Sequence, residues 1–413
     1  MSHSFFRTNN GSRGVGHAAF SDHGRALQET TVTSGFRLAD GDYFARLIVG
    51  DEESREFYFL IDTGSFLTWM QCEPCLECYP QMDEPVYDPR RSTTFSEVDG
   101  RSEFCRQLPD IIRISGPESP TCRYFQEYGD QSTTEGRIVR ETIAMDESGH
   151  SFAKVAFGCS ERSLGTFNPT AGILALGRHS YASLPAQLRR AYNVPYRFSY
   201  CFPPMFSADT STLAFGGPIP PNTVFTPLIV DPIDGQTHHL FVEILEISVG
   251  GTSLALPELG LFGIDPTTGE GGAFIDTGLT ITELPQDAYE QVFHTIKDTI
   301  AYASPQLRRA QPYDSLGVDL CYLPRDSNVD ESHLLDGVPS MAFHFAGGAT
   351  LDLPPEHVII PIQHGHGRDK RVCLSFSTID DAKTIIGNVH QQRVRITFDM
   401  ENERVGFTPP NAC

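Results

Sequence analysis

The feature that most constrains this chain is a short motif that occurs twice. Residues 59–65 read FLIDTGS and residues 273–278 read AFIDTG, so an apolar, strand-like run ends in Asp-Thr-Gly in each half of the chain. The two aspartates, Asp62 and Asp276, lie about half a chain apart. Because burying a carboxylate at the end of an apolar strand is costly, two such placements need a joint explanation.

The two halves share a second pattern. Residues 171–177 read AGILALG and residues 384–389 read TIIGNV, each an apolar segment with a glycine turn that follows its Asp-Thr-Gly at a distance. A period of roughly 200 residues is too long for a solenoid repeat, so we interpret it as the duplication of a whole lobe. The Gly- and Pro-rich segment 216–222 indicates the boundary. The predicted parts are a polar tail or remnant pro-segment (1–32), an N-terminal lobe (33–218) and a C-terminal lobe (219–413).

Composition favours a β protein with short elements. The 36 glycines and 29 prolines, spread along the chain, are typical of many strands joined by turns. Only residues 183–190 and 285–293 have the apolar spacing of helices. A net charge of −22 argues against a nucleic-acid partner, because phosphates would be repelled. No apolar run approaches the ~18 residues of a membrane span.

Paired aspartates have a specific chemistry. Two carboxyl groups within hydrogen-bond distance cannot both ionise cheaply, so they share a proton. One can then act as a general base on water while the other donates a proton to a carbonyl oxygen. Gly64 and Gly278 would let the backbone approach the pair, and the hydroxyls of Thr63 and Thr277 could bond across to the other lobe. A single Asp-Thr-Gly, in contrast, usually marks only a strand-to-turn junction.

Taken together, the motifs resemble the pepsin-like aspartic proteases and, within them, the plant nepenthesin-like branch. The resemblance runs from about Asp42 to Cys413. Its blocks, in the family's order, are IDTGSFLTWMQCEPCLECY (61–79), YGDQSTTEG (128–136), VAFGC (155–159), AGILALGR (171–178), FSYC (198–201), ISVGG (247–251), AFIDTGLTITEL (273–284), DLCY (319–322) and IIGNVHQQ (385–392). Aspartic proteases are themselves the standard example of a carboxylate pair that shares a proton.

This resemblance implies a fold and an activity. The fold would be all-β and bilobal, with two duplicated β-barrel-like lobes and a few short helices. The protein would be an aspartic endopeptidase that cleaves an extended peptide or protein substrate at acidic pH, using water activated by the aspartate pair. It would need no cofactor and no metal, and we expect a monomer without a membrane span.

Position by position, the resemblance also assigns roles. The catalytic pair would be Asp62 and Asp276. Residues that support the pair would be Thr63, Gly64, Ser65, Thr277 and Gly278, with Ser65 hydrogen-bonded to Asp62. Residues of a β-hairpin flap that closes over the substrate would be Tyr128, Gly129 and Asp130, with Trp69, the only tryptophan, packed beside Tyr128.

Three positions depart from the family pattern. Leu279 stands where a hydroxyl residue usually follows the second Asp-Thr-Gly, and losing that donor should raise the pKa of Asp276. Phe66 replaces a small or polar residue, and Gln131 replaces a flap glycine. These departures keep an alternative open, a catalytically weak or inactive pepsin-fold protein that acts as a binding protein or inhibitor.

The ten cysteines indicate disulfides and an oxidising compartment. Cys72, Cys75 and Cys78 are spaced like metal ligands, but no nearby fourth cysteine completes a cluster. The remaining candidates are Cys105, Cys122, Cys159, Cys201, Cys321, Cys373 and Cys413. The nepenthesin-like branch carries twelve cysteines, and its pattern implies a bridge between Cys321 and Cys373 and, more weakly, one between Cys201 and Cys413.

The compartment implied by the resemblance and the cysteines is extracellular or vacuolar. The first residues, MSHSFFRTNN, lack the basic start and apolar core of a signal peptide. Either a leader has been removed or the inference of secretion is wrong.

Overall fold

The structure is a computed structural model, and it describes most of the chain from residue 28 onward. The described residues are 28–35, 41–51, 54–81, 85–110, 112–114, 116, 118–145, 151–167, 170–178, 181–205, 207–229, 239–254, 262–265, 267–313, 317–326, 328–362, 370–379 and 382–409. Among them, no helix is long and apolar enough to cross a membrane.

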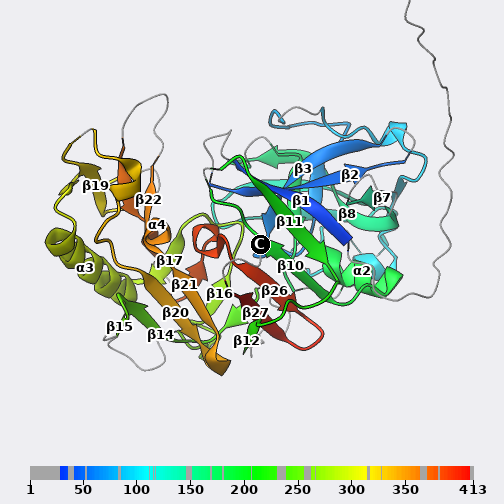
Figure 1. The fold of residues 1–413 in the computed structure, drawn as a ribbon. Helices are drawn as coiled ribbons and strands as arrows, with labels where there is room; N and C mark the ends of the chain where they lie inside the picture. Colours follow the sequence, from blue (N-terminus) through cyan, green and yellow to red (C-terminus); the bar gives the residue numbers. More distant parts are fainter. Residues whose placement is uncertain are drawn as a thin grey trace, which may run out of the picture.

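Strands dominate the described residues, and a 14-stranded sheet joins the N-terminal strands, at the right of Figure 1, to the C-terminal strands β26 and β27 near its centre. Its order is β12 (Val224–Pro227), β27 (Arg404–Thr408), β26 (Arg395–Asp399), β10 (Arg197–Cys201), β11 (Thr210–Phe215), β1 (Gln28–Ser34), β2 (Tyr43–Val49), β3 (Arg55–Asp62), β9 (Gly172–Ala175), β4 (Trp69–Gln71), β8 (Ser151–Leu164), β7 (Thr133–Ala144) and β5 (Ser96–Glu97), with β6 (Arg123–Glu127) paired to β7. Strands from both ends of the chain therefore share one sheet.

Three smaller sheets belong to the second half of the chain. The five-stranded sheet has the order β13 (Phe241–Val242), β16 (Ala273–Ile275), β25 (Thr384–Ile386), β17 (Thr282–Pro285) and β24 (Phe376–Ile379). One four-stranded sheet has the order β15 (Thr252–Ser253), β14 (Ile244–Val249), β20 (Met341–Phe345) and β21 (Thr350–Leu353), and the other has β18 (Leu307–Arg309), β19 (Cys321–Pro324), β23 (Val372–Leu374) and β22 (Ile359–Pro361).

The described helices are few and follow ordinary sequence signals. They are α1 (Glu103–Arg106), α2 (Leu184–Tyr192), α3 (Gln286–Ala303) and α4 (Pro355–Val358). The residues that α3 buries include Ala288, Val292, Ile296 and Ile300, spaced every four positions, which makes one apolar stripe. Helix α2 ends at Asn193, whose φ of 54° is the left-handed conformation of a helix C-cap. Both helical predictions are confirmed, and α3 continues well beyond the predicted segment.

The duplication inferred from the sequence reappears in strand pairing. Strand β3, which ends at Asp62, runs parallel to β9, and β16, which leads to Asp276, runs parallel to β25. The strand after each turn, β4 or β17, pairs antiparallel with the same partner. The backbone bonds correspond as well: Gly177 N–H donates to Ser65 O, and Asn388 N–H donates to Leu279 O, both at 2.7 Å. The fold is thus bilobal and pepsin-like.

One predicted boundary needs correction. The tail was predicted to reach residue 32, but Gln28–Ser34 forms β1, which pairs with β11 and β2. The alternation of the strand QETTVTS was hidden because its buried positions include a glutamine and a threonine instead of large apolar residues. Residues 1–27 lie outside the described part of the chain, and the boundary near residue 218 remains a prediction.

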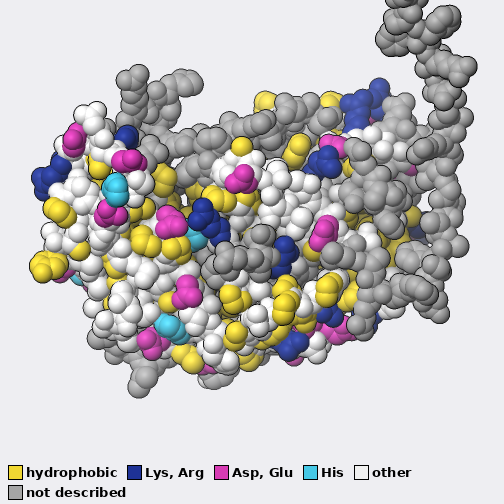
Figure 2. All heavy atoms as spheres, viewed as in Figure 1, with side chains coloured by type: hydrophobic (Ala, Val, Ile, Leu, Met, Phe, Trp, Pro, Cys, Tyr) yellow, Lys and Arg dark blue, Asp and Glu magenta, His cyan; other side chains and the backbone are white. Residues whose placement is uncertain are grey.

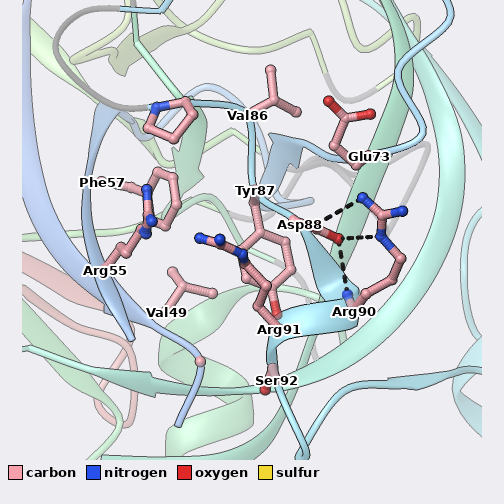
Figure 3. Close-up of a pocket in the computed structure, with 12 residues that line it drawn as sticks. Val49, Arg55, Phe57, Glu73, Val86, Tyr87, Asp88, Arg90, Arg91 and Ser92 are labelled. Carbon is pink, nitrogen blue, oxygen red and sulfur yellow. Dashed lines mark hydrogen bonds and ion pairs between the residues drawn. The ribbon is translucent and has the colours of Figure 1, made fainter. Parts of the chain in front are cut away.

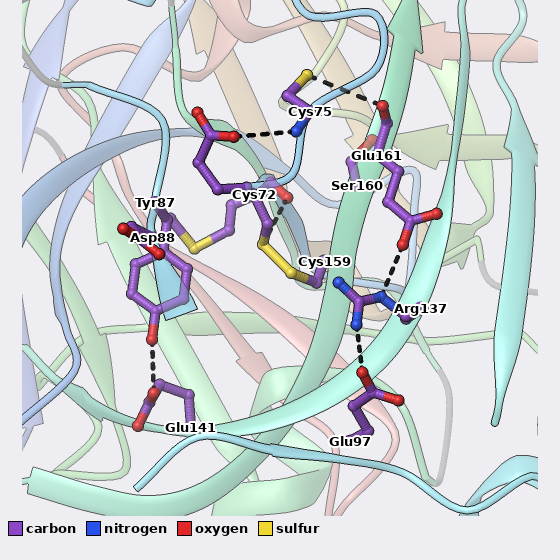
Figure 4. The surroundings of a disulfide bond; sticks show 12 residues. Cys72, Cys75, Tyr87, Asp88, Glu97, Arg137, Glu141, Cys159, Ser160 and Glu161 are labelled. Atoms are coloured by element: carbon purple, nitrogen blue, oxygen red, sulfur yellow. Dashed lines mark hydrogen bonds and ion pairs between the residues drawn. A yellow bond between two sulfur atoms is a disulfide. The ribbon is translucent and has the colours of Figure 1, made fainter. Parts of the chain in front are cut away.

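Disulfides cross-link segments in both halves of the chain. The described bridges are Cys72–Cys159, Cys75–Cys78, Cys105–Cys122 and Cys321–Cys373, so the structure contains the predicted Cys321–Cys373 bridge. The Cys72–Cys159 bridge joins the end of β4 to β8 (Figure 4). Beside it, the Tyr87 hydroxyl donates to Glu141 Oε2 at 2.6 Å. Cys413, the predicted partner of Cys201, lies outside the described residues.

Candidate active site

The two Asp-Thr-Gly turns are bonded directly to each other. Thr63 N–H donates to the Thr277 hydroxyl and Thr277 N–H donates to the Thr63 hydroxyl, both at 3.0 Å. Each hydroxyl in turn donates to a carbonyl of the opposite strand, Ile275 O at 2.8 Å and Ile61 O at 2.7 Å. Both threonines are fully buried. These four symmetric hydrogen bonds therefore fix the position of the Asp62 turn relative to the Asp276 turn.

Glycine is required at the next position in both turns. Gly64 N–H donates to Asp62 Oδ1 at 2.7 Å, and Gly278 N–H donates to Asp276 Oδ1 at 2.8 Å. A Cβ atom at Gly64 would stand 2.5 Å from Asp276 Oδ2, and one at Gly278 would stand 2.8 Å from Asp62 Oδ1. Since either contact is far below van der Waals distance, any side chain there would displace a carboxyl group.

The two carboxyl groups are not equivalent. Burial raises the pKa of Asp62, whereas burial and the charge of Asp62 together raise the pKa of Asp276 well above its ordinary value. A hydrogen bond between the two carboxyl groups lowers the pKa of Asp62 and raises that of Asp276. Both pKa values are raised, and the charge of Asp62 adds to the rise at Asp276, so we expect the shared proton to reside on Asp276.

The residues that follow the two turns explain part of this difference. Ser65 lowers the pKa of Asp62 as a side-chain donor, although its Oγ makes no hydrogen bond of regular geometry among the described residues. The contact between the Ser65 hydroxyl and the Asp62 carboxylate is therefore weaker than a regular hydrogen bond. Leu279 occupies the corresponding position beside Asp276 and has no donor, in line with the expectation from sequence.

We expect Leu279→Ser to make the pair more symmetric. A new hydroxyl beside Asp276 would stabilise its anion, so the upper limb of the pH profile of peptide cleavage should move to lower pH by about one unit. Ser65→Ala is the matched variant, and it should move the lower limb upward because Asp62 loses a donor. Initial rates measured across acidic pH check both shifts, and a profile unchanged in both variants would contradict the assignment of Asp276 as the acid.

Buried amides support the backbone around Asp276. The Gln391 side-chain N–H donates to Asp276 O at 3.0 Å, and the Tyr200 hydroxyl donates to Gln391 Oε1. Asn388 Nδ2 donates to Thr277 O at 3.2 Å. In the sequence these positions stand within the segments that resemble the family, and no role was predicted for them. The sequence did contain a signal for Asn388 and Gln391: amide side chains next to the apolar residues of β25 are rarely buried unless they form hydrogen bonds.

The predicted flap residues lie together in a β-hairpin. Tyr128 directly follows β6, and its N–H donates to Ser132 O at 2.9 Å, which closes the turn to β7. Trp69 Nε1–H donates to the Tyr128 hydroxyl at 2.7 Å. Phe167 packs edge-on against both rings, with centroid distances of 4.9 Å to Trp69 and 5.6 Å to Tyr128. Phe167 was not foreseen, because it comes from a separate loop.

The turn of the hairpin is fastened by an acidic residue. Asp130 accepts hydrogen bonds from Ser132 N–H at 2.9 Å, from the Ser132 hydroxyl at 2.7 Å and from the Thr166 hydroxyl at 2.6 Å. Gly129 has open space around its Cα. Gln131 has a φ of 68°, the left-handed conformation that favours glycine, which explains why a glycine is usual there. The charge of Asp62 contributes, after burial, to a raised pKa of Tyr128.

A pocket on the N-terminal lobe contains none of the predicted site residues (Figure 3). It has a volume of about 250 Å³ and is lined by Arg55, Arg90 and Arg91 together with Asp88 and Glu73. Arg90 makes a two-fold contact with Asp88, at 2.8 and 2.9 Å. Because Asp88 and Glu73 line the pocket together with the arginines, the pocket is not a simple anion-binding site.

This geometry defines a class of protein. Two related β lobes, each of which contributes one Asp-Thr-Gly turn to a braced pair of buried aspartates, are the architecture of a pepsin-like protein.

Comparisons with known proteins give the family. A family model described as xylanase inhibitor N-terminal matches residues 43–217, and one described as xylanase inhibitor C-terminal matches residues 239–409. Aspartyl protease family protein 2 of Arabidopsis thaliana is 34% identical over 382 residues, which are 92% of this chain and 73% of that protein. Aspartic proteinase nepenthesin-2 of Nepenthes gracilis is 32% identical over 387 residues, 92% of this chain and 79% of that protein. The chain belongs to the pepsin-like aspartic protease family, in its nepenthesin-like branch.

Solved structures agree on the fold. The crystal structure of edgp matches with a TM-score of 0.71 at 18% identity, over 94% of this chain and 95% of that one. Basic 7S globulin from soybean matches with a TM-score of 0.71 at 18% identity, over 94% and 98%.

Proposed function

We propose that the protein is an aspartic endopeptidase and that Asp62 and Asp276 are its catalytic pair. The observation that carries the proposal is geometric: the Thr63–Thr277 brace brings each aspartate against the glycine of the opposite turn. The raised pKa of both aspartates agrees with a pair that shares a proton. Such a pair supplies a base and an acid at one place without a metal or a covalent intermediate. The curated relatives named as aspartic proteases support the same reading.

In the proposed reaction, Asp62 accepts a proton from water as the water attacks the scissile carbonyl. Asp276 donates its proton to the carbonyl oxygen, which gives a neutral tetrahedral intermediate. As the C–N bond breaks, Asp62 passes the proton it took from water to the leaving amine, and Asp276 takes back a proton from the hydroxyl that becomes the new carbonyl, so the pair returns to its starting state. The substrate would be an extended peptide, and the hairpin that carries Tyr128 would cover it. No cofactor takes part in this scheme.

The alternative is a binding protein or inhibitor on the same scaffold. Leu279 favours it, because it removes a donor from Asp276, and the matching family models are described as xylanase inhibitor domains. The braced pair of aspartates is nevertheless intact, and a protein that only binds has no need of a shared proton. We therefore place the endopeptidase first.

We infer that the protein works in the secretory pathway, outside the cell or in a vacuole. The support is that no described cysteine is free, which is typical of proteins from oxidising compartments.

The pH dependence of cleavage tests the proposal. Only the singly protonated pair is active, so the rate on a denatured protein substrate should be greatest at acidic pH and fall as Asp276 ionises. Because the pKa of Asp276 is raised, the decline should lie closer to neutrality than for an ordinary carboxyl pair. A rate that peaks above neutral pH, or no cleavage at any pH by the oxidised protein, would contradict the proposal.

A further inference from the structure

Each Asp-Thr-Gly turn, with the residues after it, is held by backbone N–H groups of a second segment, residues 175–177 in the first half and 387–388 in the second. In the first half three successive N–H groups donate: Ala175 to Thr68 Oγ1 at 3.1 Å, Leu176 to Asp62 O at 2.7 Å and Gly177 to Ser65 O at 2.7 Å. In the second half two donate: Gly387 to Thr282 Oγ1 at 3.0 Å and Asn388 to Leu279 O at 2.7 Å. The accepting residues occupy equivalent positions after Asp62 and Asp276.

One backbone donor is therefore missing from the second half. Leu176, which holds Asp62 O, has no counterpart there, because the second segment is one residue shorter. Among the described residues, no backbone N–H group donates to Asp276 O, and the side chain of Gln391 does so instead, at 3.0 Å. The carbonyl of the proposed acid is thus held by a side chain, whereas that of the proposed base is held by the backbone.

The amide of Gln391 is fixed in one orientation. Its Nε2 lies against two carbonyl oxygens, Asp276 O at 3.0 Å and Ile386 O at 2.8 Å, and carbonyl oxygens can only accept hydrogen bonds. Its Oε1 accepts a hydrogen bond from the Tyr200 hydroxyl at 2.5 Å. Gln391 and Tyr200 are both fully buried, so water does not compete for these bonds.

Tyr200 connects this amide to the sheet that both halves share. It lies on β10, opposite Leu213 of β11 on one side and Ile396 of β26 on the other, and β10 and β26 lie near the centre of Figure 1. Burial and the charge of Asp276 raise the pKa of Tyr200 well above its ordinary value, so the hydroxyl keeps the proton that it donates. In the same view, Figure 2 shows charged side chains of both signs spread over the surface, whereas the bonds between Tyr200, Gln391 and Asp276 O involve no charged group.

We propose that Gln391, held by Tyr200, is a positioning residue for Asp276: its amide replaces the missing backbone donor and ties the second turn to the sheet that joins the two halves. Without this amide, Asp276 O would have no donor among the described residues, and a shift of the turn would move the carboxyl group with it. The inference rests on the proposed function, in which Asp276 donates a proton to the substrate.

Steady-state cleavage of a peptide substrate gives the first test. Gln391→Met keeps the length of the side chain and removes the amide, so kcat should fall roughly 100-fold while KM changes less than about twofold, because a misplaced acid slows proton transfer and not substrate binding. Tyr200→Phe, the milder variant, lets the amide turn and should lower kcat roughly fivefold. Gln392→Met is the matched control, because this buried amide bonds Met205 N–H and Val389 O instead of Asp276. It should keep the wild-type kcat.

Hydrogen exchange gives the second test and needs no activity. In Gln391→Met and Tyr200→Phe, the amides of residues 273–279 should exchange at least about fivefold faster than in wild type, and those of residues 59–65 should keep their rates. Gln392→Met should change neither segment, nor should Tyr43→Phe, which removes a buried hydroxyl bonded to Pro203 O.

The two tests separate this inference from the proposed function. Faster exchange in residues 273–279 of a protein that cleaves no peptide would refute the endopeptidase and support the role of Gln391 in holding the turn. Unchanged exchange there in Gln391→Met, an unchanged kcat in that variant, or an equal loss of kcat in Gln392→Met would overturn the inference.

Discussion

Asp62→Asn and Asp276→Asn are each expected to lower kcat for peptide cleavage by at least about a thousandfold. In the first variant the amide cannot accept a proton from water, and in the second it cannot donate the acidic proton of a carboxyl group. Both substitutions keep the shape of the side chain, and the brace between Thr63 and Thr277 involves neither carboxyl group. The loss should therefore appear in the rate and not in stability.

Asp298→Asn is the matched control, an exposed aspartate on α3 that belongs to neither Asp-Thr-Gly turn. It should cleave the denatured substrate at the wild-type rate. The double variant should be no slower than either single variant, because the two groups act as one unit. If wild type and both Asp→Asn variants cleave at the same rate, the protein is not an aspartic endopeptidase. The alternative, a binding protein or inhibitor with the same fold, would then be favoured.

Much of the site could be predicted because the sequence repeats itself. The recurrence of Asp-Thr-Gly located both aspartates, and the later recurrence of an apolar-glycine segment indicated a duplicated lobe. The structure shows that duplication as the parallel pairing of β9 with β3 and of β25 with β16. A turn motif is local, so its residues are neighbours in sequence as well as in space. The threonine brace was predicted from the same repeat, because a hydroxyl follows each aspartate and could bond across to the other lobe.

What the sequence could not supply are contacts between distant segments. Phe167 joins Trp69 and Tyr128 from a separate loop, and its aromatic side chain has no periodic pattern that marks it. Strand β1 was assigned to a tail because its buried positions carry polar residues. His390 lies within a block that was quoted for its resemblance, yet its burial depends on a fold that brings Ser375 and Thr282 to its two ring nitrogens.

His390 is expected to make the fold sensitive to acid. The ring is fully buried between the Thr282 hydroxyl at Nδ1 and the Ser375 hydroxyl and His357 carbonyl at Nε2. Burial and the neighbouring His357 lower the pKa of His390 to about 3. The unfolded chain takes up this proton near pH 6.5, whereas the folded chain resists it until about pH 3. The free energy of unfolding should therefore fall through this window by up to about 1.4 kcal/mol per pH unit.

His390→Gln isolates this effect in urea unfolding curves recorded by circular dichroism. At neutral pH the variant should be less stable by about 1–3 kcal/mol, because Thr282 and Ser375 lose a partner. As the pH falls from 6.5 towards 3, the deficit should shrink and then reverse, since the variant has no buried ring to protonate. His294→Gln, an exposed histidine of α3, should leave the slope unchanged. Parallel curves for wild type and His390→Gln would refute the prediction.

The carboxyl pair has the opposite pH dependence. Its folded pKa values are raised, so it destabilises the fold as the pH rises above the ordinary carboxyl range, and this cost disappears in acid. The buried His390 and His357, whose pKa is lowered to about 4, weaken the fold over the same acidic range in which the pair is proposed to be active. His390 is linked to the active-site turn through β25: Thr282 Oγ1 also accepts a hydrogen bond from Gly387 N–H at 3.0 Å, and the preceding Ile386 O accepts one from Asp276 N–H at 3.0 Å. We therefore expect His390→Gln to extend the time for which activity survives at low pH, measured as residual cleavage after incubation near pH 3.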